Sequence, residues 1–187
     1  MMKIKIIILS LLASVISTIN VSGQTDVAFS NVPVVNGKVV FQQFIPNAEG
    51  VDAVQQYKRL QQWGRDRFQG NPLLSGIRFD DKGRTITISS GEELQLKTGN
   101  SGSSKMTMRY RFDTSVTNAG YMLVVRDITY QSEQPKNASS FPKTYTAEQM
   151  ITDQAVNTTG EDNALRSGAR NATLNFLNEL YAELSAL

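Results

Sequence analysis

The chain has 187 residues, with 19 lysines and arginines, 17 aspartates and glutamates, and neither histidine nor cysteine. These absences exclude a Ser-His-Asp triad, an imidazole proton shuttle, a thiol nucleophile and metal sites built from thiolates or imidazoles. The sequence contains no phosphate-binding lysine loop, dinucleotide fingerprint or nucleophile elbow. We therefore expect no cofactor, no metal and no enzymatic activity, unless the protein uses carboxylates alone.

The first 23 residues have the layout of a secretory signal peptide. Lys3 and Lys5 lead into an almost unbroken apolar run over residues 4–16, and Gly23 places a small residue before Gln24. The run is shorter than the ~20 apolar residues that cross a bilayer as a helix; an uncleaved anchor is the alternative. Without cysteine the chain cannot be a bacterial lipoprotein. We expect an exported protein, periplasmic or extracellular, with no membrane span once the leader is removed.

Removal of the leader balances the charge of the chain. Of the 19 basic residues, Lys3 and Lys5 lie in the leader, which has no acid, so 17 basic and 17 acidic residues remain. Proteins that bind nucleic acid usually carry an excess or a stripe of lysine and arginine, because phosphate contacts dominate their affinity. We therefore expect no nucleic-acid partner. The remaining residues suffice for one domain that buries roughly 70% of its unfolded surface.

A hairpin and a helix are predicted first. The Asn36-Gly37 pair between two β-rich runs is typical of a type I′ turn, whose central residues both need positive φ. A strand follows over residues 38–45. Apolar residues then recur every three or four positions over residues 51–69, which predicts an amphipathic helix. Its expected buried stripe is Val54, Tyr57, Leu60, Trp63 or Gly64, and Phe68.

Four strands are predicted next, over residues 77–80, 84–96, 106–114 and 121–130. We expect a bulge at Gly91 within the second strand and a hairpin loop over residues 98–105. In the fourth strand, Tyr121, Leu123 and Val125 share one phase of the alternation, whereas Ile128 and Tyr130 fall on the other. A bulge near Asp127 would restore the phase.

The C-terminal part is predicted to be a polar loop followed by a helix. Within residues 132–160, Thr146 and Gln149 have the spacing of a capping box that begins a short helix. Residues 161–184 form an amphipathic pattern with an apolar side made of Leu165, Ala169, Ala172, Phe176, Leu177, Leu180 and Leu184.

The predicted fold class is α+β, with a curved antiparallel sheet, two helices on one face and the order β-α-β-β-β-β-α. Both amphipathic helices must bury their apolar sides, and the sheet is the available partner. The predicted organisation is a signal peptide (1–23), an extension with a short hairpin strand (24–37), the α+β domain (38–131), the polar loop (132–160) and the C-terminal helix (161–187).

Four stretches carry a resemblance to a known family: VVNGKVVFQQF, YKRLQQWGRDRF, RTITISSGEELQL and YRFDTSVTNAGYMLVVRDITYQ. They are similar to a family of secreted proteins from Bacteroides-type bacteria, a domain of unknown function with a TATA-binding-protein-like fold. The resemblance covers about Val34 to Gln131. It implies a fold and a compartment, and it implies no activity and no catalytic residues.

The strand over residues 106–114 supplies the candidate site. Its inward set is expected to be Met106, Met108, Tyr110 and Phe112. The outward set is Arg109, Arg111 and Asp113, joined by Arg126 from the next strand. Opposite charges on neighbouring strands pair and contribute about 0.2–1 kcal/mol each, so one interpretation is a solvated row of ion pairs. The other is a binding face for an anionic ligand.

The resemblance does not extend to DNA binding. The sheet surface of the TATA-binding protein presents basic residues and inserts apolar wedges between bases. In this chain the aromatic residues Tyr110 and Phe112 fall on the inward positions of their strand.

Three functions remain open. The preferred one is a non-catalytic domain that binds a protein, a glycan or another envelope component. The second is a small-molecule carrier, with a pocket between the sheet and the C-terminal helix lined by Met106, Met108 and Leu180. The third is a carboxylate-based hydrolase. Its candidate acids, Asp80-Asp81 and Glu92-Glu93, each adjoin a turn glycine, where solvated acids are common.

We predict that the mature protein begins near Gln24. Mass spectrometry of the native product should show the leader missing, because Gly23 offers a small residue at the cleavage site. A full-length species retained in the membrane fraction would contradict the prediction.

Overall fold

A computed structural model describes residues 27–98, 102–132, 142–160 and 162–187. The predicted leader lies outside these residues. The elements are β1 (Val34–Val35), β2 (Lys38–Val39), β3 (Phe41–Pro46), α1 (Ala53–Phe68), β4 (Gly76–Asp80), β5 (Thr85–Thr98), β6 (Gly102–Val116), β7 (Gly120–Ser132), β8 (Thr144–Thr146), α2 (Ala147–Met150), α3 (Asp153–Asn157) and α4 (Asn163–Ser185).

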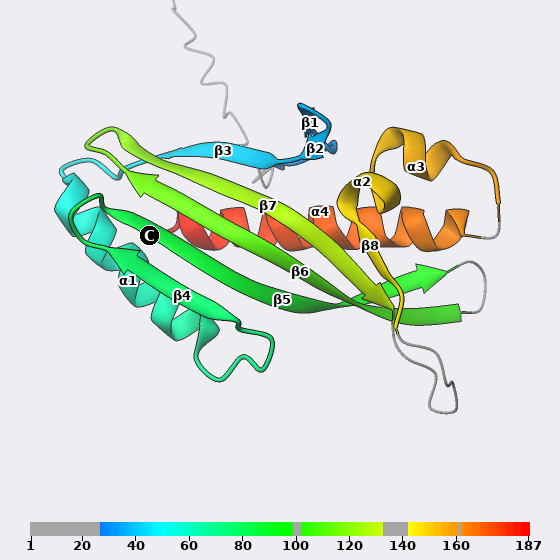
Figure 1. Ribbon diagram of the computed structural model, residues 1–187. Coiled ribbons are helices and arrows are strands. Elements are labelled where there is room, and N and C mark those ends of the chain that lie inside the picture. Colours follow the sequence, from blue (N-terminus) through cyan, green and yellow to red (C-terminus); the bar gives the residue numbers. More distant parts are fainter. Residues whose placement is uncertain (1–26, 99–101, 133–141, 161) are drawn as a thin grey trace, which may run out of the picture.

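An antiparallel six-stranded sheet forms the centre of the molecule. Its strand order is β3-β7-β6-β5-β4, and β8 pairs with β7 beside β3. Figure 1 shows α1 and α4 on the same side of this sheet. The predicted α+β class, with helices on one face, is therefore confirmed. The predicted order β-α-β-β-β-β-α is carried by β3, α1, β4 to β7, and α4.

The buried face of the sheet follows the alternation read from the sequence. Met106, Met108, Tyr110 and Phe112 of β6 are all buried. On the next strand, Tyr121, Leu123 and Val125 are buried with them, as are Ile86 and Ile88 of β5. These side chains share one face because residues two apart on a strand point the same way. We call this the inner face and the opposite one the outer face.

A bulge in β7 sits where the broken alternation predicts it. Arg111 lies opposite Arg126, but Arg109 lies opposite Thr129, so two residues of β7 face the single residue between them on β6. Asp127 has a φ of 55° at this point. The extra residue returns Ile128 and Tyr130 to the inner face, where both are buried.

Helix α1 is capped at its N-terminus by Asp52, whose carboxylate accepts the backbone N–H groups of Val54 and Gln55, both at 2.8 Å. Its buried residues are Ala53, Gln56, Tyr57, Leu60, Gly64 and Phe68. Val54 was expected in the buried stripe, but it is exposed because it lies one position away from that row. Gly64 faces β4 and β5, where a Cβ would make ordinary van der Waals contact with Ile77 and Ile88 at 3.4 and 3.6 Å.

Trp63 is half-buried between the two long helices and the sheet. Its ring packs against Phe68 and Phe112, with centroids 5.9 and 5.7 Å away. Its indole N–H donates to the Glu183 carboxylate of α4 at 3.2 Å. The residue therefore joins α1, β6 and α4.

Helix α4 crosses the inner face and is tied to it by polar contacts as well as apolar ones. Its buried residues are Ala169, Thr173, Phe176, Leu177, Leu180 and Leu184. The Tyr130 and Thr173 hydroxyls lie 2.8 Å apart in the core, and the Thr173 hydroxyl also donates to the Ala169 carbonyl at 2.7 Å. At the other end of the helix, the Tyr121 hydroxyl donates to the Leu184 carbonyl at 2.5 Å.

Several local expectations were wrong. The strand expected over residues 38–45 is divided at Val40, because β2 pairs with β1 whereas β3 joins the main sheet. The loop expected over residues 98–105 is shorter, since β6 already begins at Gly102. Gly91 forms no bulge, because the β5–β6 register is unbroken. A Cβ at Gly91 would lie 2.9 Å from the Met108 carbonyl oxygen, which explains the glycine.

The segment expected to be a polar loop contains more structure than predicted. The helix begun by the Thr146 capping box is confirmed as α2, and the Gln149 side chain accepts the Thr146 backbone N–H at 3.0 Å. Strand β8 and helix α3 were not expected. They pack beside β7 and the N-terminal half of α4 (Figure 1).

The Tyr130–Thr173 contact predicts a measurable coupling between β7 and α4. Thr173→Val keeps the side-chain shape but leaves the buried Tyr130 hydroxyl without this partner, at a cost of about 1–3 kcal/mol. Tyr130→Phe should cost less, because the Thr173 hydroxyl keeps its bond to Ala169. Urea unfolding of both single variants and the double variant should show that the double costs less than the sum of the two. Fully additive costs would contradict the coupling.

Candidate functional site

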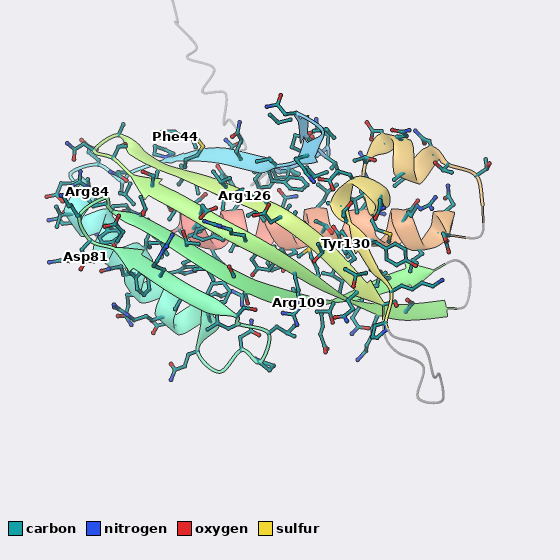
Figure 2. All side chains as sticks on the ribbon, in the orientation of Figure 1. Phe44, Asp81, Arg84, Arg109, Arg126 and Tyr130 are labelled. Atoms are coloured by element: carbon teal, nitrogen blue, oxygen red, sulfur yellow. The ribbon has the colours of Figure 1, made fainter. Side chains whose placement is uncertain are left out.

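All four candidate residues lie on the outer face of the sheet, which none of the described helices covers. Arg109, Arg111 and Asp113 follow one another at alternate positions of β6, and Arg126 lies opposite Arg111 on β7. Figure 2 shows Arg109 and Arg126 on the side of the sheet turned away from α4. The predicted direction of these side chains is therefore confirmed.

Three of the four form one ion-paired cluster around Asp113. The Asp113 carboxylate accepts the Nε–H groups of Arg111 and Arg126 at 3.1 and 2.9 Å, and the Thr87 hydroxyl at 2.8 Å. Arg126 also reaches the Asp127 carboxylate at 3.3 Å. The contacts therefore span β5, β6 and β7. Arg109 lies on the other side of the bulge, opposite Thr129, and contributes none of these contacts.

The hydrogen bonds of Asp113 determine its charge. Partial burial raises the pKa of this carboxyl, but the bonds from Thr87, Arg126 and Arg111 outweigh burial and hold the pKa below its usual value. The ionised form is therefore favoured in the folded protein. Both arginines are about one-third exposed, so the pairs contribute little to stability individually.

The outer face also carries an apolar area that was not predicted. Phe44 of β3 is 43% exposed and lies opposite Met122 of β7, which is 38% exposed. A shallow hollow of about 290 Å³ continues from Met122 and Val124 to Asp113. Figure 2 shows Phe44 at the β3 edge of the sheet. Apolar and ion-paired groups therefore adjoin on one open surface, and we call the area formed by Phe44, Met122, Val124, Arg111, Asp113 and Arg126 the outer-face patch.

The pocket expected for a small-molecule carrier is filled by side chains. Met106, Met108 and Leu180 are at most 2% exposed and belong to the hydrophobic core. The Thr173 hydroxyl lies 3.7 Å from the Met108 sulfur, and the rings of Tyr110 and Phe176 lie 5.1 Å apart. No room for a ligand remains at these residues.

The candidate acid pairs do not converge. One Asp80 carboxylate oxygen accepts the backbone N–H groups of Lys82 and Gly83, both at 3.1 Å, and so stabilises its own turn. Asp81 accepts the Tyr57 hydroxyl at 3.1 Å and so fastens α1. Glu92 and Glu93 are successive residues of β5, and their side chains therefore point to opposite faces. Each acid thus has a structural role or stands apart from its neighbour.

In the described part of the chain, no group of three or more acidic side chains is arranged to hold a metal ion. Nor is any helix of this part both long and apolar enough to cross a membrane.

We predict that Asp113 contributes more to the free energy of unfolding than either arginine of the cluster. Arg111→Ala and Arg126→Ala should each cost about 0–1 kcal/mol, as for exposed charge pairs. Asp113→Asn should cost more than either, because it leaves two neighbouring arginines without their shared carboxylate. The folded pKa of Asp113 is lowered, so its contribution is present above the unfolded pKa and is lost as the pH falls through the folded one. Thermal melts at neutral and strongly acidic pH should show the Asp113→Asn deficit only at neutral pH. A deficit that persists in acid would contradict the assignment.

The fold is similar to that of two solved structures. A TBP-like protein from Parabacteroides distasonis is 24% identical, with a TM-score of 0.65 over 82% of this chain and 94% of that one. A DUF4468 family protein from Bacteroides ovatus is 20% identical, with a TM-score of 0.67 over 87% of this chain and 92% of that one. No curated protein gives a significant match.

Residues 41–131, from the first residue of β3 to the penultimate residue of β7, match the model of a family described as a domain of unknown function (DUF4468) with TBP-like fold. This match agrees with the resemblance carried by the four sequence stretches and with the two solved structures. Residues 41–131 therefore match the DUF4468 family, and the chain has the TBP-like fold of the two solved structures.

Proposed function

We propose that the protein is an exported, non-catalytic binding domain that holds a protein partner on the outer-face patch. The observation that carries the proposal is that one face of the sheet is packed under helices while the other exposes Phe44 and Met122 beside fixed arginines. Exposed apolar side chains gathered in one place commonly mark an interaction surface.

The composition of the patch favours a protein over a glycan or an anionic polymer. Phenylalanine, methionine and arginine are the residues enriched at the centre of protein interfaces. Arg111 and Arg126 are already neutralised in part by Asp113 and Asp127, so a partner can cover them without leaving isolated charges. The same pairing weakens the attraction for phosphate groups, in agreement with a balanced charge after loss of the leader.

Export is supported by the leader sequence alone, and lack of catalysis is supported by the side-chain chemistry. The chain has no histidine or cysteine, and Asp80 and Asp81 are used to hold a turn and helix α1. A carrier function with a pocket at Met106, Met108 and Leu180 has no support, since these side chains belong to the filled core.

A photo-crosslinking residue placed at Met122 in the native cells tests the proposal. The matched control is the same residue at Val54, which is also apolar and is 50% exposed, but lies on α1 at the other side of the molecule. We expect one defined protein adduct from position 122 and none from position 54, and mass spectrometry should identify the partner as an envelope or secreted protein. The same adducts from both positions, or none from position 122, would contradict the proposed face. A cytoplasmic partner would contradict export.

A further inference from the structure

Strand β5 has an edge that is open over part of its length. On one side β5 pairs with β6 without interruption from Thr85 to Thr98. On the other side β4 pairs only with residues 85–89. Within the described ranges no strand pairs with this second side of β5 beyond Ser89, and Figure 1 shows β5 and β6 extending past β4.

The backbone groups on the open edge can be identified from the hydrogen bonds of β5. The Ser89 carbonyl accepts the Ser75 N–H at 2.8 Å, on the β4 side. The Arg84 carbonyl accepts the Val116 N–H at 3.1 Å, on the β6 side. Successive residues of a strand alternate their backbone groups between the two sides, and the register here is unbroken. The N–H and C=O groups of Glu93 and Gln95 therefore face away from β6, at the open edge.

A groove of about 910 Å³ adjoins this edge and extends over α4 to Phe29, which packs on Phe41 of β3. Its lining includes Glu92 to Gln95 of β5, the side of α4 from Asn163 to Glu179, and Phe29. Small residues of α4, namely Ala164, Gly168 and Ala172, recur at every fourth position beneath it. The lined part of α4 is roughly 24 Å long at 1.5 Å per residue, enough for a strand of about seven residues.

The charged residues that line the groove are all acidic. Glu92, Glu93 and Glu179 line it, and no lysine or arginine is among its lining residues. Glu92 is half-buried; burial raises the pKa of its carboxyl, and Glu179, Glu93 and Glu183 add to this, whereas Arg67 opposes it. A cation entering beside Glu92 would relieve this repulsion. The exposed amides Asn171 and Asn175 of α4 face the same space and can both donate and accept.

We propose that this groove binds an extended polypeptide segment rich in lysine or arginine, which adds to the sheet along the open edge of β5. The outward backbone groups of Glu93 and Gln95 repeat at the spacing of a strand, which suits a peptide backbone better than a sugar chain. Glu92 and Glu93 point to opposite faces of the sheet. A basic side chain on either face of the added strand would therefore lie near an acid. This site is separate from the outer-face patch and does not depend on the function proposed for it.

Binding of four labelled peptides to the protein purified after expression of the full chain tests this site. The first is an eight-residue peptide of alternating lysine and valine. The second has glutamate in place of lysine. The third and fourth keep the lysines but carry N-methyl groups on alternate residues, one peptide for each of the two phases, so that one edge of each backbone cannot donate. By fluorescence anisotropy we expect binding of the first, none of the second, and a loss of about tenfold or more for one N-methylated phase.

Two variants locate the site on β5. Gln95→Pro removes an outward N–H without removing a bond to β6, and proline is tolerated on an edge strand. Gln95→Val is the matched control, because it keeps the N–H. We expect the proline variant to lose affinity and the valine variant to keep it, with melting of each variant checked. Equal affinity for both N-methylated phases and the parent peptide, or no binding of the lysine peptide, would overturn the proposal.

Discussion

The inner face of the antiparallel sheet has to be covered, and the arrangement of the other elements follows from that requirement. An alternating sheet with one apolar face is stable only when another layer removes that face from water. Helices α1 and α4 both serve this purpose from the same side, with Phe112 packed against Trp63 and Tyr110 against Phe176. Buried hydroxyl contacts from Tyr121 and Tyr130 then fix the position of α4 along the sheet. Among the described residues no helix covers the outer face, which leaves this face open to a partner.

The bulge at Asp127 connects the core to the surface chemistry. It restores Ile128 and Tyr130 to the inner face, so the last part of β7 can contribute to the packing against α4. On the outer face the same bulge separates Arg109 from the cluster of Arg111, Asp113 and Arg126. The two open features of the molecule thus have different physical origins. The outer-face patch results from one-sided coverage of the sheet, and the β5 groove results from a strand that is longer than its neighbour.

The sequence predicted those features that depend on local periodicity. The alternation in β6 assigned both faces of that strand, and the phase change after Val125 located the bulge. The patch was only half predicted, because the exposure of Phe44 and Met122 depends on how β3 pairs with β7, and no local pattern gives that register. The β5 edge was missed for the same reason, since it exists because β4 pairs with β5 only as far as Ser89, opposite Gly76. Gly91 was misread because close contact with the Met108 carbonyl and a bulge both favour glycine.

We conclude that the inner face holds the fold together while the outer face contributes little to stability and is free to bind. Leu123 and Met122 are neighbours on β7 that point to opposite faces, so a comparison of Leu123→Ala with Met122→Ala by urea unfolding separates the contributions of the two faces. Leu123 is fully buried, and its loss should cost about 2–5 kcal/mol. Loss of the Met122 side chain should change the free energy of unfolding by no more than about 0.5 kcal/mol. Similar costs for the two substitutions would show that the outer face also stabilises the fold, and would contradict the claim.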